Sequence, residues 1–444
     1  MIGSLKESPE KFFATLEKHD RLISYNLNLL ILFGMCFLLW VDSLTGAMTF
    51  YGVGIGSVSV LYKLVILMLV MANIASTKPK VIAAFLLVII VLMIGPSQSL
   101  LTHGETGFYF ADFALLFKII TPFIAFTYFY LLHKTYPELT ATWLPRILFV
   151  NFAAVFTNLT LGLLGFGFPS YSGVEGQPGI GVNGFYVAGN ELSACFALLF
   201  GFVLHYVWNH HSKKMYVVMA IITFAFGTAI ATKTAMLASL LLIFALPLFN
   251  ERENIFKFTR LKALVFIPFF IIASVLVIYI ANFLTAIGLY DKITWVLQEK
   301  GLLTLILSGR DIKSAIIFDH FFRHMDQLDY LWGIGSSGIK HFEYPYYSIE
   351  IDPFDVFVWF GAVGLTYIFI ALVTMNYVAF RQLRSRRPYP PLIVVVNVLL
   401  LVLSFVSGHI WTSGMLGILW GALNAMAFIA PMDQNRRLSR SIKS

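Results

Sequence analysis

Three acidic side chains stand together at the start of one apolar stretch of this chain. Glu350, Asp352 and Asp355 lie in SIEIDPFDVFVWFGAVG, where the sequence changes from polar to strongly apolar. A carboxylate partly shielded from water has a raised proton affinity and suits a general base, or it ligates a divalent cation. The same residues also fit a helix start, with Asp352 as the N-cap, Pro353 at the first helical position and Asp355 at the third. Both interpretations stay open, because capping and catalysis are compatible.

Two basic residues occupy positions that suit an anionic ligand. Arg310, in ILSGRDIKSAI, precedes an amphipathic segment, and its planar guanidinium matches the spacing of phosphate oxygens. Lys233, in AIATKTAML, lies between two apolar runs and could supply a second cation. Each also has a simpler interpretation, Arg310 as a residue bound to lipid headgroups and Lys233 as a snorkelling anchor.

Further polar and aromatic residues are candidates with weaker support. Asn190, in AGNELSACF, begins an apolar stretch, where it either caps a helix or contacts a ligand. Tyr347 stands in HFEYPYYSIE, a run of rings that suits sugar stacking and equally suits a headgroup interface. His320 and His341 have no paired ligand spacing, so we expect no metal site.

The composition predicts that lipid is the solvent for most of the chain. Of the 444 residues, 59% are hydrophobic and 12% are charged, and the mean hydropathy is +0.81. Cys36 and Cys195 both lie in apolar runs, which argues against a disulfide framework or a cysteine-ligated metal. The net charge of +8 comes from short basic clusters between apolar stretches, as membrane topology requires, so we expect no nucleic-acid partner.

Apolar stretches long enough to cross a bilayer as helices predict an all-α polytopic membrane protein. We expect about twelve such spans, near residues 22–41, 56–75, 81–97, 111–132, 146–167, 191–208, 215–231, 235–249, 263–287, 353–379, 391–408 and 415–430. The first span also serves as the membrane signal, because no cleavable signal peptide precedes it.

The positions of Lys and Arg predict the orientation. Most of them fall on the connections that are cytoplasmic if the N-terminus is cytoplasmic, so we expect both termini inside. The chain then divides into residues 1–287 with nine helices, a large external loop at 288–352 with short helices, and residues 353–444 with three helices and a cytoplasmic tail. This loop is exempt from the charge rule because of its length.

Four segments in order resemble the O-antigen polymerase and ligase superfamily of membrane glycosyltransferases. They are GVNGFYVAGNELS, ATKTAML, LSGRDIKSAI with the later LWGIGSSG, and IEIDPFDVFVWFGAVG, and together they span residues 181 to 364. The resemblance implies a glycan carried on undecaprenyl pyrophosphate as donor, a sugar hydroxyl of a second lipid-linked glycan as acceptor, and no cofactor. It places the protein in the bacterial cytoplasmic (inner) membrane with its site on the periplasmic face, and it leaves a chain-length regulator open as a protein partner.

The resemblance also implies roles for single residues. Arg310 matches an arginine thought to hold the pyrophosphate, and Lys233 stands where the family has a second arginine, which keeps the charge but loses the bidentate fork. Glu350 and Asp352 stand where ligases tend to have histidine, which favours a polymerase in which one of the two acids is the base. Asn190, Asp355 and Tyr347 are then expected to contact the substrate.

Two alternative functions remain at this stage. Within the family, the alternative is a ligase that joins finished polymer to the lipid A core. Outside it, the alternative is a twelve-helix transporter, although no internal repeat of the kind common in such carriers is evident.

Overall fold

The computed structural model describes residues 24–54, 57–104, 106–171, 179–251, 290–341 and 348–430, together with isolated positions between 257 and 271. Within these ranges the chain is helical apart from connections and two isolated bridges, Phe168 to Gly184 and Tyr171 to Ile180. The all-α prediction is confirmed for this part. Tyr347 and most of the predicted span at 263–287 lie outside the described residues.

Seven helices of the described part are long and apolar enough to cross a membrane, which supports a membrane-embedded protein. A further pair, Ser24–Met35 and α2 (Leu38–Phe50), is bent by 45° and counts as an eighth span if it is continuous. Fewer spans than the predicted twelve therefore meet the criterion of length in the described ranges. The seven are α3 (Val58–Thr77), α4 (Pro79–Leu92) continued by α5 (Ile94–His103), α6 (Thr106–Thr135), α7 (Pro137–Leu163), α8 (Gly189–His210), α10 (Lys233–Asn250) and α17 (Asp352–Arg381).

Three shorter helices cover other stretches for which spans are predicted. They are α9 (Lys213–Ala229), α18 (Pro390–Val406) and α19 (Gly417–Ala425), the last continued by the 3-10 turn η2 (Met426–Phe428). A non-helical segment, residues 407–416, joins α18 to α19.

The bend before α2 is held by a buried side chain of α7. Asn151 Oδ1 accepts a hydrogen bond from the Leu39 amide at 2.9 Å, and its Nδ2 donates to the Met35 carbonyl at 3.0 Å. These backbone groups are left without helical partners at the break, and an unpaired polar group in an apolar environment is costly. The amide of Asn151 therefore makes the bend stable inside the bundle.

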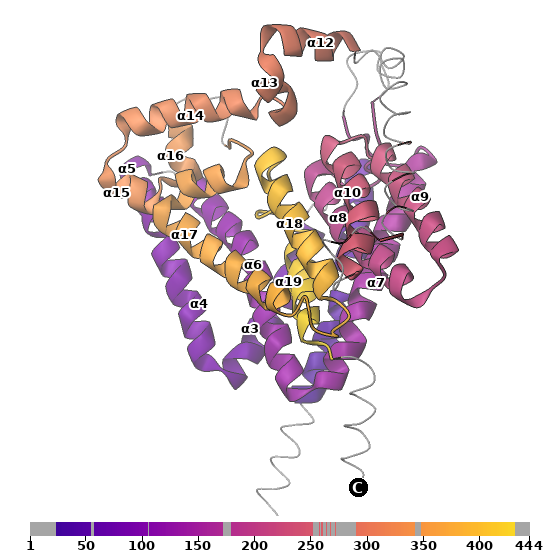
Figure 1. Ribbon diagram of the computed structural model, residues 1–444. Helices are drawn as coiled ribbons and strands as arrows, with labels where there is room; N and C mark the ends of the chain where they lie inside the picture. The colour runs from indigo at the N-terminus through magenta and orange to yellow at the C-terminus, as the bar shows by residue number, and fades with distance from the viewer. Residues whose placement is uncertain are drawn as a thin grey trace, which may run out of the picture.

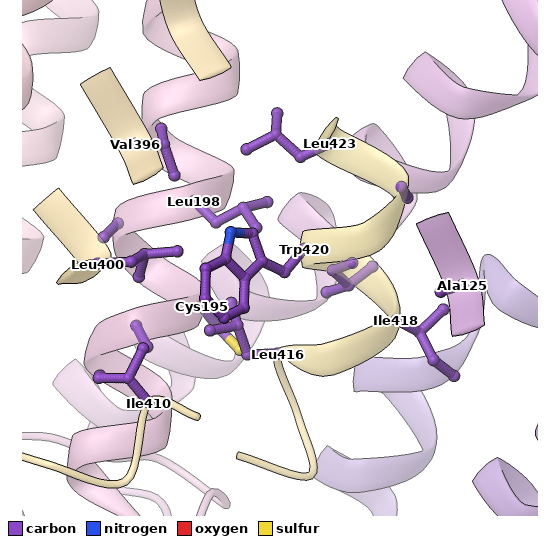
Figure 2. Close-up of a cluster of buried hydrophobic side chains, with 14 of the residues drawn as sticks. Ala125, Cys195, Leu198, Val396, Leu400, Ile410, Leu416, Ile418, Trp420 and Leu423 are labelled. Atoms are coloured by element: carbon purple, nitrogen blue, oxygen red, sulfur yellow. The ribbon is translucent and has the colours of Figure 1, made fainter. Parts of the chain in front are cut away.

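The centre of the bundle is formed by α19 against α6, α8 and α18. Figure 2 shows Trp420 of α19 with its indole among Cys195 and Leu198 of α8 and Leu400 of α18. Gly421, on the same helix, lies so close to α6 that a side chain there would overlap the α6 backbone. In lipid the hydrophobic effect does not drive helices together, so close packing at small residues such as this glycine is important for their association.

Five short helices lie between residue 290 and α17. They are α12 (Tyr290–Glu299), α13 (Gly301–Leu307), α14 (Arg310–His324), α15 (Gln327–Trp332) and α16 (Gly335–His341). Figure 1 shows α12, α13 and α14 along the upper end of the bundle, with α15 and α16 beside α5 and α17. The external position of this region stays a prediction.

Helix α16 is fastened to the bundle by buried polar contacts. The Ser336 amide donates to Asp112 Oδ1 of α6 at 2.7 Å, and the Ser337 and Ser99 hydroxyls are 2.8 Å apart. Asp112 is fully buried. The short-helix region is thus fixed to α5 and α6 near its C-terminal end.

Candidate functional site

A cavity of about 300 Å³ lies where the short helices meet the bundle. Its wall includes Asn190 of α8, Lys233 of α10, Arg310 of α14 and Ser407, which follows α18. Segments separated by more than two hundred residues of sequence therefore share one site. The two charged side chains that line it are both cationic, Lys233 and Arg310.

Three helices begin at this cavity. The lining residues include Gly189 and Asn190 from the first turn of α8, Lys233 and Thr234 from the first turn of α10, and Arg310, the first residue of α14. A helix N-terminus presents unpaired amides and carries roughly half a positive charge, so it attracts anions. Together with the two cations, the three N-termini give the cavity the electrostatics of an anion site.

The backbone around the cavity adopts conformations that side chains rarely permit. Ala231, Ser308, Glu350 and His409 are the non-glycine residues with positive φ in the described part of the chain, with φ between 57° and 65°. Ser308 lines the cavity, Ala231 directly precedes and His409 closely follows lining residues, and Glu350 is paired with the lining residue Arg310. Such strain costs about 1–3 kcal/mol at each residue and persists where the surrounding structure imposes it, commonly at functional sites.

Arg310 is held in place by an acid from the segment before α17. Its Nη2 donates to Glu350 Oε2 at 3.0 Å, and Lys313 Nζ, one turn further along α14, lies 2.5 Å from Glu350 Oε1. Burial raises the pKa of Glu350, but the bonds and charges of Lys313 and Arg310 outweigh it, so this pKa lies below its usual range. Glu350 is therefore a charged partner of the two cations at neutral pH.

The hydrogen bonds of the Arg310 guanidinium are incomplete. Its Nη1 donates to the Leu307 and Val406 carbonyls at 3.2 and 3.4 Å, while its buried Nε has no hydrogen-bond partner among the described residues. An unsatisfied donor on a buried cation is costly.

Lys233 reaches the cavity from the first position of α10. Thr232, the N-cap, accepts a hydrogen bond from the Ala235 amide at 3.1 Å and so starts the helix. The Lys233 ammonium donates to the Leu305 carbonyl and to Ser308 Oγ, the latter at 3.0 Å. These contacts connect α10 to the end of α13 and place the ammonium in the same cavity as Arg310.

The carboxylates of Asp352 and Asp355 accept hydrogen bonds from backbone amides. Asp352 Oδ2 accepts from the Ile410 and Trp411 amides at 2.9 and 3.0 Å, whereas Asp355 Oδ1 accepts from the Ile349 amide at 2.6 Å. Both carboxyl groups are buried. The observed start of α17 is one residue earlier than expected. Its N-cap is Ile351, and Asp352 is the first helical residue. Asp352 thus anchors the 407–416 segment instead of capping its own helix.

Asn190 has a structural partner as well as a place in the cavity wall. Its Nδ2 donates to the Ser407 carbonyl at 3.2 Å. The neighbouring Glu191 accepts from Ser413 Oγ at 2.8 Å and from the Met415 amide at 3.2 Å. The start of α8 therefore holds both ends of the segment that follows α18.

The structure brings the sequence candidates Arg310, Lys233, Glu350 and Asn190 together, and it adds the 407–416 segment, for which no role was predicted. That segment contains only one ionisable residue, His409, and its other residues gave no charge pattern. A signal was present in SGHIWTSG, where polar and glycine residues interrupt two apolar runs. Asp112 was missed in the same way, although an acid at the edge of a predicted span deserves a functional hypothesis.

No group of three or more His, Cys, Asp or Glu side chains that could hold a metal ion is found among the described residues. Both described cysteines, Cys36 and Cys195, are buried. The polar chemistry of the cavity therefore rests on nitrogen cations, hydroxyl groups and backbone amides.

Comparison with known proteins adds no family assignment: no family model, curated protein or solved structure matches this chain.

Proposed function

We propose that the protein is a polysaccharide polymerase of the bacterial inner membrane, a glycosyltransferase that moves an undecaprenyl-pyrophosphate-linked glycan onto a sugar hydroxyl of another lipid-linked repeat unit. The observation that carries this proposal is the meeting of Lys233, Arg310 and three helix N-termini in one cavity. The diphosphate of the donor occupies this cavity. The membrane-embedded helices suit a substrate whose carrier is a lipid.

The proposed reaction depends on stabilising the departing diphosphate. Attack by a hydroxyl at the anomeric carbon breaks the bond between that carbon and the diphosphate oxygen, and negative charge develops on the leaving oxygen. Preorganised cations and amide dipoles at that position lower the barrier more than they stabilise the bound substrate. Lys233, Arg310 and the N-termini of α8, α10 and α14 supply such charges.

Glu350 acts in this proposal as a resident competitor of the diphosphate. Its carboxylate forms an ion pair with the guanidinium of Arg310. A diphosphate carries more charge and more acceptor oxygens than one carboxylate, so it displaces Glu350 toward Lys313, which already binds the other oxygen. The site is therefore kept ordered until the donor arrives.

Replacement of Arg310 tests the proposal in cells. Arg310→Ala is expected to slow polymerisation by about 10- to 150-fold and so to shift surface glycan toward single repeat units, because the leaving group loses a cation worth about 1.5–3 kcal/mol. Arg323→Ala is the matched control, since Arg323 lies at the other end of α14 and its side chain is 71% exposed. The measurement is the length distribution of surface glycan at equal protein abundance in the membrane.

Each outcome of this experiment separates the candidate functions. A core capped by single repeats in the Arg310→Ala strain supports polymerisation, whereas lipid-linked full-length polymer that accumulates in that strain identifies a ligase. Wild-type polymer length and yield in Arg310→Ala would remove the proposed site.

A further inference from the structure

The connection between α7 and α8 supplies a part of the cavity wall that carries no charge. Ser170 and Tyr171 of this connection line the cavity together with Lys233 and Arg310. A hydroxyl group and an aromatic ring are not needed to attract a diphosphate, because the two cations already do so. This part of the wall therefore suits a different portion of the ligand.

Two antiparallel pairings fold this connection back toward its start. Tyr171 and Ile180 exchange two backbone hydrogen bonds of 2.9 Å, and the Asn183 amide donates to the Phe168 carbonyl at 3.0 Å. Ser170 lies between these pairings, and its Oγ donates to Asn183 Oδ1 at 2.8 Å. The paired segments, residues 168–171 and 180–184, thus hold the backbone of both cavity-lining residues.

The second of the paired segments packs against the turn that leads into α10. The Val182 amide donates to the Ala229 carbonyl, at the end of α9, at 2.9 Å. Gly181 lies so close to the Ile230 carbonyl that a side chain would overlap it, and its φ of 80° is in the left-handed region. Glycine suits this position for both reasons. The paired segments are therefore held at a fixed place relative to the start of α10.

A buried side chain of α7 anchors the paired segments to the bundle. Asn158 Nδ2 donates to the Asn183 carbonyl at 2.8 Å, and its Oδ1 accepts from the Phe185 amide at 2.7 Å. Both asparagines are buried. Contacts with α7 and α9 thus fix this part of the wall before a ligand binds, which lowers the entropy cost of binding.

The uncharged side chains of this wall match the chemistry of a sugar. Tyr171 is 51% exposed, so a ligand can cover a large part of it. An aromatic ring packs against apolar C–H groups, which a sugar presents on the faces of its ring. Ser170 uses its hydroxyl proton on Asn183 and keeps lone pairs for a donor. A sugar hydroxyl is such a donor, whereas an ionised diphosphate is an acceptor and a prenyl chain has no polar group.

We propose that the paired segments form the subsite for the sugar attached to the donor diphosphate, with the Tyr171 ring against the sugar face and Ser170 Oγ accepting from a sugar hydroxyl. This inference rests on the proposed function. The first sugar is joined directly to the diphosphate, so a diphosphate bound by Lys233 and Arg310 brings that sugar into the same cavity. Tyr171 then holds the anomeric carbon close to the cations that stabilise the leaving group.

The test is calorimetric titration of the purified full-length protein in detergent with two lipids. One is undecaprenyl diphosphate, and the other is the same lipid carrying the first sugar of the host's repeat unit. The wild-type protein should bind the sugar-bearing lipid more tightly. Tyr171→Ala should weaken binding of that lipid roughly tenfold, because the ring contact is lost, and leave the affinity for the bare lipid within about twofold. Tyr171→Phe, which keeps the ring, should bind both lipids as wild type does.

A matched control and the bare lipid separate this proposal from the one on which it rests. Tyr377→Ala should bind both lipids as wild type does, because Tyr377 is 58% exposed near the C-terminal end of α17. An unchanged preference for the sugar-bearing lipid in Tyr171→Ala, equal weakening of both lipids in that variant, or no preference in the wild-type protein overturns the sugar subsite. Failure of the wild-type protein to bind either lipid overturns the proposed function itself.

Discussion

At the scale of single residues, the site is a set of charges that hold one another before any ligand binds. Arg310 and Lys313 share the carboxylate of Glu350, while Lys233 binds a carbonyl and a hydroxyl at the end of α13. This preorganisation reduces the cost of ordering long side chains when an anion binds. It also makes the stability of the region depend on pH.

Acid should destabilise the wild-type protein more than a variant that lacks the Glu350 carboxyl. The pKa of Glu350 is lowered in the folded state, so its ion pairs stabilise the protein fully above the unfolded pKa near 4.5. That stabilisation is lost as pH falls through the lower folded pKa. Between about pH 5 and pH 3, the thermal midpoint should therefore fall more steeply for wild type than for Glu350→Gln. Parallel pH profiles of the two proteins would contradict this assignment.

The sequence allowed the charged residues of the site to be predicted, because a charge beside an apolar stretch is conspicuous. Arg310, Lys233 and Glu350 were found on this basis, and the structure brings them to one region. The roles of the acids were harder to predict. Whether a carboxylate faces a ligand or a backbone amide depends on a segment sixty residues away, which holds Asp352 through Ile410 and Trp411.

At the scale of helices and connections, the cavity exists because several helix ends meet. The starts of α8, α10 and α14 and the segment after α18 form its wall. Hydropathy predicted apolar helices at α8, α10 and α18; α8 and α10 are long enough to cross a membrane, and α18 is a shorter apolar helix. Hydropathy could not predict that residues 407–416 are irregular and buried. That conformation depends on the carboxylates of Glu191 in α8 and Asp352 in α17, which accept hydrogen bonds from the segment.

Two glycines of the 407–416 segment give a matched test of this arrangement. Gly408→Ala should destabilise the protein by more than about 2 kcal/mol, because φ is positive and the new methyl group would overlap the Glu350 carbonyl. Gly414→Ala should have little effect, since its nearest neighbour is the Lys118 side chain at 3.6 Å. Thermal unfolding in detergent measures both. Equal midpoints for the two variants would show that the segment is not packed as described.

At the scale of the whole molecule, the ends of the helices that form the cavity lie on the side where the sequence analysis placed the external loop. The starts of α8, α10 and α17 and the end of α18 were all predicted as external, and they meet at one end of the bundle (Figure 1). This agreement supports the predicted arrangement of spans. The direction of the bundle in the membrane remains a prediction from the charge rule.

Labelling with a membrane-impermeant maleimide tests the direction. Ser308→Cys, exposed at the cavity, should react in intact spheroplasts, whereas Arg384→Cys, exposed after α17, should react only after lysis. The background is expected to be low, because Cys36 and Cys195 are both buried. Labelling of position 384 alone in intact spheroplasts would invert the topology.

The most direct test of the central claim is the affinity of the purified full-length protein for undecaprenyl diphosphate, measured by calorimetric titration in detergent with undecaprenyl monophosphate for comparison. The wild-type protein should prefer the diphosphate. Lys233→Ala and Arg310→Ala should each weaken its binding roughly 10- to 100-fold, while Arg323→Ala binds as wild type does. Equal affinity of all four proteins for the diphosphate would contradict the assignment of this cavity as the diphosphate site.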